Sequence, residues 1–151
     1  MKRKREKLFL LQIEKLDKVI NRKTAEAQKW RRIATSLGFQ QSGDRVQTSG
    51  PKDRLKIADR YIDIERDIAK LGMQQQAIID IIESLPKIEY DVLYSVYVLK
   101  KEYQEIADEN GVSYSWVTTY HGRGLEAVKR ILDKTEDEIV KSILDEMEDE
   151  I

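Results

Sequence analysis

Hydroxyl and aromatic side chains are concentrated between residues 113 and 119, and three basic residues follow them. The set consists of Ser113, Tyr114, Ser115, Trp116, Thr118, Thr119, Arg123, Lys129 and Arg130. Hydroxyl and indole groups can contact the edges and methyl groups of DNA bases, whereas guanidinium and ammonium groups bind phosphate. These residue types therefore predict a surface that binds double-stranded DNA, provided that one helix over about 114–132 presents them.

Residues that could support catalysis or hold a cofactor are not arranged for either role. The chain has no cysteine and a single histidine, His121. It also lacks a glycine-rich phosphate loop, a nucleophile with a plausible base, and the ligand spacing of a metal site. We therefore expect no enzymatic activity, no cofactor, and no catalytic or metal-binding residue.

The stretch 103–120 has the pattern of two helices joined by a tight turn. Gly111 stands where the turn needs a left-handed conformation, which costs glycine least. Ser113 follows at the position where a hydroxyl caps the next helix. The expected packing positions hold Ile106, Ala107, Val112, Val117 and Tyr120. Together these residues predict a helix-turn-helix, whose second helix usually lies in the DNA major groove.

The candidate residues near the start of this second helix also have structural alternatives. The face opposite Val117 and Tyr120 is expected to hold Ser115, Trp116 and Thr119. Trp116 could instead be buried against the N-terminal helices, and Ser113 could serve only as a cap. Ser113 and Tyr114 would otherwise bind phosphate through the helix N-terminus and the phenol.

The residues farther along the same helix allow two interpretations each. The three basic residues could hold the DNA backbone or form a solvated helix face. His121 is expected to pack or to face solvent rather than to ligate or catalyse. Gly122 and Gly124 each cost up to about 1 kcal/mol relative to alanine within a helix. That cost indicates a close backbone approach, either to the helix expected over 86–100 or to DNA.

Apolar residues recur at spacings of four and three in two long N-terminal stretches. They are Phe9, Ile13, Leu16, Ile20, Ala27, Trp30, Ala34 and Leu37 in the first, and Ile57, Tyr61, Ile64, Ile68, Leu71, Ile78, Ile82 and Leu85 in the second. This spacing is typical of a coiled coil; Lys23 interrupts it in the first stretch, and Gln75 is its one polar position in the second. Gly38 is expected to end the first helix and Pro51 to begin the second, with a flexible loop over 38–51. Two such helices should form an antiparallel hairpin, and a second copy of the chain is the alternative or additional partner.

The C-terminal half should contain two further helices besides the helix-turn-helix. Pro86 is expected to begin a helix to about Lys100, with Ile88, Val92, Leu93, Val96, Tyr97 and Leu99 on its apolar stripe. The sequence Thr135-Glu136-Asp137-Glu138 matches a capping box. It should start a short acidic helix with Ile139, Ile143, Met147 and Ile151 on one face. The predicted fold class is all-α: a long hairpin over 1–85, a helix-turn-helix bundle over 86–132 and an acidic helix over 133–151.

Charge is distributed unevenly although the net charge is only −1. Residues 1–37 carry twelve Lys/Arg against four Asp/Glu, a net +8, whereas residues 133–151 carry two against nine, a net −7. This asymmetry indicates either a polyanion-facing front and an acidic tail, or two solvated helix faces. The basic segment Lys2–Lys7 could likewise contact phosphate or be a solvated terminus.

Membrane and export signals are not found in the sequence. No apolar run approaches the roughly 20 residues of a membrane span. The apolar run behind the basic start extends only from Leu8 to Leu11, which is too short for a secretory signal. We therefore expect a cytoplasmic protein that does not interact with membranes.

Residues 84–132 resemble region 4 of the bacterial sigma-70 family, the domain that binds the minus-35 promoter element. The matching features are Leu85-Pro86, the helix from Val92-Leu93 to Tyr97, Tyr103, Ile106, Ala107, Gly111, Val112 and Ser113, and then Gly122, Gly124 and Leu125. The whole chain resembles a family of small phage and prophage proteins of Gram-positive bacteria that have paired N-terminal helices. The resemblance implies a transcriptional regulator that contacts DNA and also host RNA polymerase.

The resemblance has two limits. Sigma region 4 carries charged side chains at the start of its recognition helix, where this chain has Tyr114, Ser115 and Trp116. Arginine makes the strongest guanine contact, so a different DNA sequence is expected. Residues 1–85 do not resemble a promoter-melting domain, so a complete sigma factor is not expected.

Three functional hypotheses follow. The first is a sequence-specific DNA-binding regulator of phage or prophage genes that forms a homodimer through its N-terminal helices. The second is a DNA-packaging component resembling a small terminase subunit, which would form a ring of many copies. The third is a polymerase-binding inhibitor that does not bind DNA and whose acidic tail mimics nucleic acid.

Overall fold

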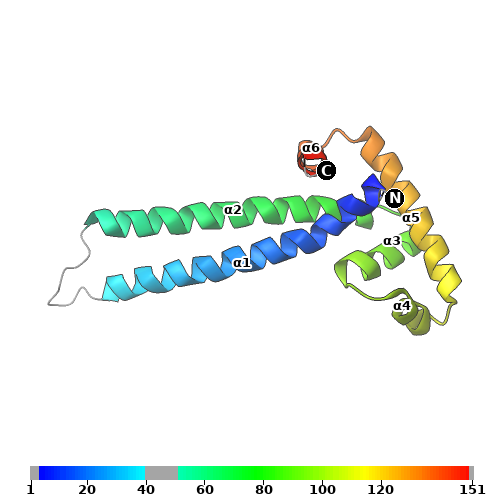
Figure 1. Cartoon of the computed structure of the whole chain (residues 1–151), viewed down its shortest axis with the longest axis horizontal. Coiled ribbons are helices and arrows are strands. Elements are labelled where there is room, and N and C mark those ends of the chain that lie inside the picture. Colours follow the sequence, from blue (N-terminus) through cyan, green and yellow to red (C-terminus); the bar gives the residue numbers. More distant parts are fainter. Residues whose placement is uncertain (1–3, 40–50, 150–151) are drawn as a thin grey trace. The chain divides into compact units, whose positions relative to one another are not determined.

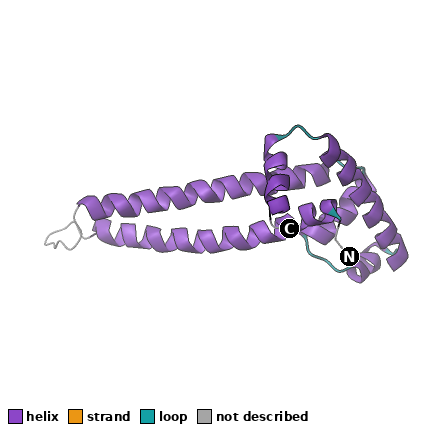
Figure 2. Ribbon diagram, turned by 45° about the horizontal axis from the view of Figure 1, so that its top comes forward, coloured by secondary structure: helices purple, strands orange, loops and turns teal. Residues whose placement is uncertain are grey.

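The structure, a computed structural model, describes residues 4–39 and 51–149, with side chains described for 4–36 and 54–149. These residues form only helices and short connections (Figure 2), which confirms the predicted all-α class. The helices are α1 (Arg5–Phe39), α2 (Pro51–Glu83), α3 (Lys87–Leu93), the π-helix η1 (Tyr94–Val98), α4 (Tyr103–Asn110), α5 (Tyr114–Lys134) and α6 (Glu138–Asp149).

The chain divides into two compact units. Residues 17–72 form one, which we call the hairpin unit, and the residues before 17 and after 72 form the other, the bundle unit. The first turns of α1 and the last turns of α2 therefore belong to the bundle unit. The predicted divisions after residues 85 and 132 correspond to breaks in secondary structure and stay predictions as domain boundaries.

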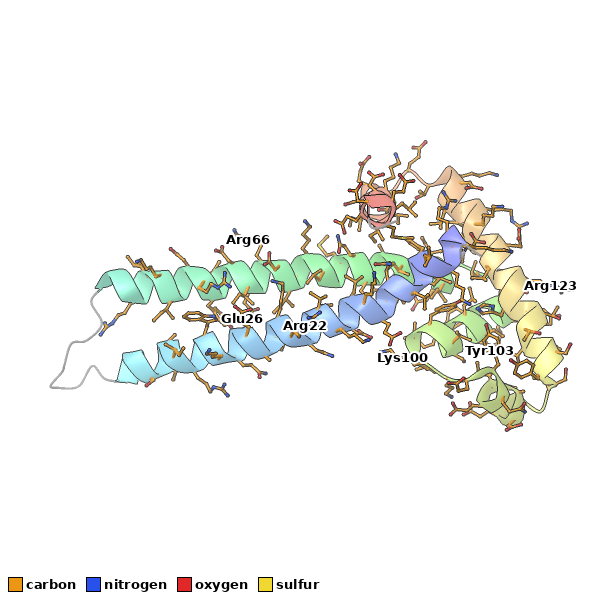
Figure 3. The ribbon with its side chains drawn as sticks, viewed as in Figure 1. Arg22, Glu26, Arg66, Lys100, Tyr103 and Arg123 are labelled. Carbon is orange, nitrogen blue, oxygen red and sulfur yellow. The ribbon has the colours of Figure 1, made fainter. Side chains whose placement is uncertain are left out.

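In the hairpin unit α1 and α2 run antiparallel, as predicted (Figure 1). Two ion pairs join the helices at matching positions: Lys23 Nζ lies 3.2 Å from Asp67, and the Arg60 guanidinium lies 2.9 Å from Glu26. Figure 3 marks Glu26 with its neighbour Arg22 on α1 and Arg66 on α2. All four paired side chains are partly exposed, so these pairs add little stability. They nevertheless fix the relative register of the two helices.

Apolar packing in the hairpin unit follows most of the predicted seam. Ala27 and Ile64 are buried, and Trp30 is half-buried. The prediction was wrong for Ala34, which is exposed.

The limits of the two long helices agree closely with the sequence. α2 begins at Pro51, and α1 extends one residue beyond Gly38 to Phe39. Residues 40–50, which contain most of the predicted flexible loop, lie outside the described residues.

The core of the bundle unit joins residues from the two ends of the chain. Its buried members are Phe9, Leu10, Ile13, Ile78, Ile81, Ile82, Leu85, Leu93, Tyr97, Leu125, Val128, Leu132, Val140, Ile143 and Met147. Gln75, the polar seam position, is accommodated because its Nε2 donates a hydrogen bond to the Ile13 carbonyl at 3.1 Å. The first turns of α1 are thus a structural part of this unit.

The helix expected over 86–100 is divided in two. Pro86 precedes α3 as predicted, but the chain then changes to the π-helix η1, in which the Leu99 amide donates to the Tyr94 carbonyl at 3.0 Å. A π-turn shifts the phase of the side chains that follow it. Leu99, which follows the π-helix, is therefore 51% exposed rather than part of the apolar stripe. The prediction was also wrong for Ile88, which precedes the π-helix and is 41% exposed.

α6 is an amphipathic helix of the core rather than a free acidic tail. Val140, Ile143 and Met147 are buried, while Ile151 lies outside the described residues. The predicted capping box was wrong: Asp137, not Thr135, caps α6, because its Oδ1 accepts from the amides of Ile139 at 2.8 Å and Val140 at 3.2 Å. A carboxylate is favoured over a hydroxyl at the positive end of the helix dipole.

Candidate nucleic-acid interface

The turn between α4 and α5 has the geometry that the sequence predicted. Gly111 adopts φ 65° and ψ 34°, in the left-handed region. The Val112 amide donates to the Ala107 carbonyl at 3.0 Å, which closes the six-residue loop of a Schellman motif. The Asn110 side chain donates to the Ile106 carbonyl at 2.7 Å. The end of α4 is therefore well supplied with hydrogen bonds, and the chain turns sharply into α5.

Small residues let α5 pack closely on its neighbours. Ala107 is buried in a cluster with Val92, Ile106 and Val117, which joins α3, α4 and α5. A Cβ atom at Gly124 would lie 2.8 Å from Leu93 Cγ. Of the two close approaches proposed for Gly124, the one to the helix after Pro86 is therefore confirmed. A Cβ at Gly122 would meet nothing within 4 Å, so no packing among the described residues requires that glycine.

Ser113 caps α5, as expected. Its Oγ accepts a hydrogen bond from the Trp116 amide at 2.9 Å. The Thr118 hydroxyl is also used locally, because it donates to the Ser115 carbonyl at 2.9 Å. Both side chains retain lone pairs, and the Ser113 hydroxyl hydrogen remains available as a donor.

Three side chains at the start of α5 are free to meet a ligand. Tyr114 is 52% exposed, and Ser115 and Thr119 are exposed on the side of α5 opposite the buried Val117. Tyr114 contacts Tyr103, with ring centroids 5.8 Å apart. Figure 3 labels Tyr103 at the start of α4. The Tyr103 contact limits the orientations of the Tyr114 phenol.

Trp116 does not lie opposite Tyr120, and that part of the prediction was wrong. The two rings are in contact, with centroids 4.5 Å apart and planes inclined by 43°. Trp116 is half-buried and packs on the cluster of Val92, Ile106 and Val117. Because four residues span slightly more than one helical turn, Trp116 and Tyr120 are neighbours along one side of α5. Trp116 is therefore covered in part by the bundle itself.

The three basic residues of the candidate surface are exposed. The Arg123 guanidinium lies over the Tyr120 ring, 4.8 Å from its centroid, and Figure 3 marks it on α5. Within the part of the chain that the structure describes, no carboxylate lies within 4.0 Å of Lys129 or Arg130. The exposed Glu126 on the same helix reduces the positive potential of this surface. Arg5 has a different role, because it pairs with Asp133.

His121 packs in the bundle, as expected, and has a partner that the sequence did not indicate. Its Nε2 lies 2.7 Å from the Tyr97 hydroxyl, and both side chains are buried. Burial, with a smaller effect of the Lys7 charge, lowers the pKa of His121 to about 4. Burial also raises the pKa of the Tyr97 phenol. At neutral pH both side chains are uncharged, so the hydrogen bond joins two neutral groups. The only available sequence signal was a tyrosine on an apolar stripe, since a buried hydroxyl needs a partner.

Neither a metal-binding cluster nor a membrane-spanning helix is found among the described residues. Residues 4–39 and 51–149 contain no group of three or more His, Asp or Glu side chains that could hold a metal ion. Within the same ranges, no helix has the length and apolarity needed to cross a membrane.

Comparison with known proteins gave no relative. No protein-family model, no curated protein and no solved structure matches the chain.

Proposed function

We propose that this protein is a sequence-specific DNA-binding regulator of phage or prophage transcription, and that α5 occupies the major groove. The observation that carries the proposal is the pairing of α4 and α5 through a left-handed glycine turn. Near the start of α5, Ser115 and Thr119 are exposed on one face of the helix. A helix held at such a turn can enter the major groove with its first residues against base edges. The hydroxyls of Ser115 and Thr119 can both donate and accept there.

The remaining candidate residues have supporting roles in this proposal. Ser113 and Tyr114 contact a phosphate at the N-terminus of α5, where amides and the helix dipole favour an anion. Arg123, Lys129 and Arg130 hold the backbone of the duplex. Trp116 packs on the bundle beside the face of α5 that holds Ser115 and Thr119, and it keeps α5 in position. Its exposed edge contacts thymine methyl groups or sugars.

The experiment begins with selection of bound sequences from a random DNA pool, because the target sequence is unknown. The double variant Ser115→Ala/Thr119→Ala is then compared with the wild type on the selected duplex. We expect affinity for the selected sequence to fall by about 10-fold or more, since each lost base contact costs about 1–3 kcal/mol. Affinity for unrelated DNA should change little.

The matched control is Thr35→Ala/Ser36→Ala, which removes the same two residue types from exposed positions of α1. Circular dichroism of both variants checks that the fold is retained. Equal binding by the folded Ser115→Ala/Thr119→Ala variant and the control would contradict the assignment of α5.

The basic residues are tested by salt dependence. If all three contact phosphates, the plot of log Kobs against log salt should have a slope of about −3, and Arg130→Ala should reduce it by about 1. An unchanged slope would mean that Arg130 belongs to a solvated face.

Host RNA polymerase is the further partner in this proposal, and the bacterial cytoplasm its location. The acidic outer face of α6 favours one alternative, a polymerase-binding inhibitor. Its exposed carboxylates are those of Glu138, Asp145, Glu146, Glu148 and Asp149. Capture of polymerase by a protein for which no DNA sequence can be selected would support the inhibitor over the regulator.

A further inference from the structure

A cavity of about 300 Å³ opens on the bundle unit between α3, η1, α4 and the first turn of α5. Two of the exposed large apolar side chains of the described residues, Ile88 and Leu99, line it. Its floor includes the buried Val92 and Ile106. A concave site of this size that combines apolar and aromatic residues with polar groups is typical of small-molecule binding.

Three aromatic residues line the cavity. Tyr90 and Tyr94 stack on each other with centroids 5.6 Å apart and planes inclined by 6°, and Trp116 lines the cavity from α5. Tyr94 and Ser95 belong to the π-helix. π-helical turns are rare and frequently occur at functional sites, because they displace side chains from the α-helical pattern. Here the π-helix brings a ring and a hydroxyl to the same cavity.

The charged side chains that line the cavity are all negative. Among the described residues that line it are two carboxylates, Asp91 and Glu109, and no lysine, arginine or histidine. Asp91 is paired with Lys87 at 3.2 Å and Glu109 with Lys101 at 2.7 Å. All four side chains are partly exposed, so these pairs are weak and leave the carboxylates able to accept a further cation.

We propose that this cavity binds a small organic amine with an aromatic or apolar body. The rings and apolar floor would enclose the body, and the ammonium group would lie between the aromatic faces and the two carboxylates. Aromatic faces attract cations because their quadrupole is negative there, and the attraction adds to that of the carboxylates. The proposal does not depend on DNA binding, since none of its residues except Trp116 belongs to the candidate DNA surface.

The probe is 2-phenylethylamine, with 2-phenylethanol and 3-phenylpropionate as a neutral and an anionic analogue of similar size. Each is titrated into the full chain while amide NMR spectra are recorded. For a ligand of about nine non-hydrogen atoms we expect millimolar affinity. The amine should shift amides of residues 88–99 and 106–116 and bind about 10-fold more tightly than the alcohol. The carboxylate should not bind.

Fluorescence supplies a local readout. In the Trp30→Phe variant Trp116 is the single remaining tryptophan, so its emission reports on this wall of the cavity. Amine binding should change the emission of Trp116 with the same midpoint as the NMR titration. Spectral changes confined to other parts of the chain would overturn the proposal.

The double variant Asp91→Asn/Glu109→Gln tests the source of the preference. It should lower the affinity for 2-phenylethylamine about 10-fold, to that of the alcohol, without altering the far-ultraviolet dichroism. The matched control is Glu105→Gln/Asp108→Asn, which also removes two carboxylates near this site but none that lines the cavity. Equal loss in both double variants, or equal binding of amine and alcohol by the wild type, would refute the amine site.

Discussion

At the scale of single residues, alanine substitutions at two glycines of α5 should change the free energy of unfolding in opposite directions. Gly124→Ala places a Cβ 2.8 Å from Leu93 Cγ, so the variant must distort a buried contact and should lose about 1–3 kcal/mol of unfolding free energy. Gly122→Ala adds its methyl group in open space. It should gain about 0.5–1 kcal/mol, because alanine loses less backbone entropy in a helix. Urea unfolding followed by circular dichroism measures both, and effects of the same sign would contradict the described α3–α5 packing.

The buried His121–Tyr97 pair predicts a dependence of stability on pH. The pKa of His121 is lowered in the folded protein from 6.5 to about 4, so the unfolded chain takes up a proton that the folded chain does not. This contribution to stability is complete above pH 6.5 and is lost as the pH falls from 6.5 through 4. Its largest value is about 3 kcal/mol.

The difference between wild type and His121→Gln isolates this term from the carboxylates, which titrate in both proteins. The difference in unfolding free energy should be constant above pH 7 and should shrink between pH 6.5 and 4. Because His121 is the only histidine of the chain, its ring proton signal in NMR also gives the pKa directly. A titration midpoint near 6.5 would contradict burial of this side chain.

At the scale of elements, substitutions at two adjacent residues of α6 test whether this helix is packed in the core. Ile143 is 4% exposed in the core, and the adjacent Ser142 is exposed. Ile143→Ala should cost about 2–4 kcal/mol, since it removes buried methyl groups and leaves a cavity. Ser142→Ala should change stability by at most about 0.5 kcal/mol. If both variants unfold like the wild type, the C-terminal helix is a solvated acidic tail after all.

Elements whose limits depend on local chemistry could be predicted from the sequence. Pro86 precedes α3, Gly111 adopts the left-handed conformation, and Ser113 caps α5, because each effect is confined to a few neighbouring residues. The cap of α6 was missed since Thr135 and Asp137 are both good capping residues, and only the packing of α6 decides between them. The two long seams were predictable because a repeat of four and three has few other structural solutions.

Features that depend on contacts between distant segments could not be predicted in this way. The partner of His121 lies 24 positions away, and nothing in the spacing of Tyr97 indicates the hydrogen bond. Trp116 is different, because its spacing of four from Tyr120 places the two residues on the same side of α5, and the sequence alone could have shown this. Its partial burial depends on the cluster that α3 and α4 provide, which the sequence does not show.

At the scale of the whole molecule, the hairpin unit carries apolar surface that its own two helices do not cover. Leu55 is 63% exposed and Ile62 is 50% exposed, seven residues apart on α2. Ala58 and Ala69, also exposed, lie at intervals that place them on the same side of the helix. If the chain forms the homodimer expected from its N-terminal helices, this stripe is the surface that we propose for it.

The double variant Leu55→Glu/Ile62→Glu should convert that dimer into a monomer, because it places charge in the middle of the stripe. The control Asn21→Glu/Gln28→Glu adds two carboxylates with the same spacing of seven at exposed positions of α1, and it should stay dimeric. Sedimentation equilibrium measures the mass against the 17.7 kDa of one chain. If the wild type is a monomer, the stripe is not a dimer surface, and any DNA binding is by single copies of the chain. A wild-type assembly of eight or more copies would favour a packaging component over a regulator, because a regulator that binds paired half-sites needs only two recognition helices.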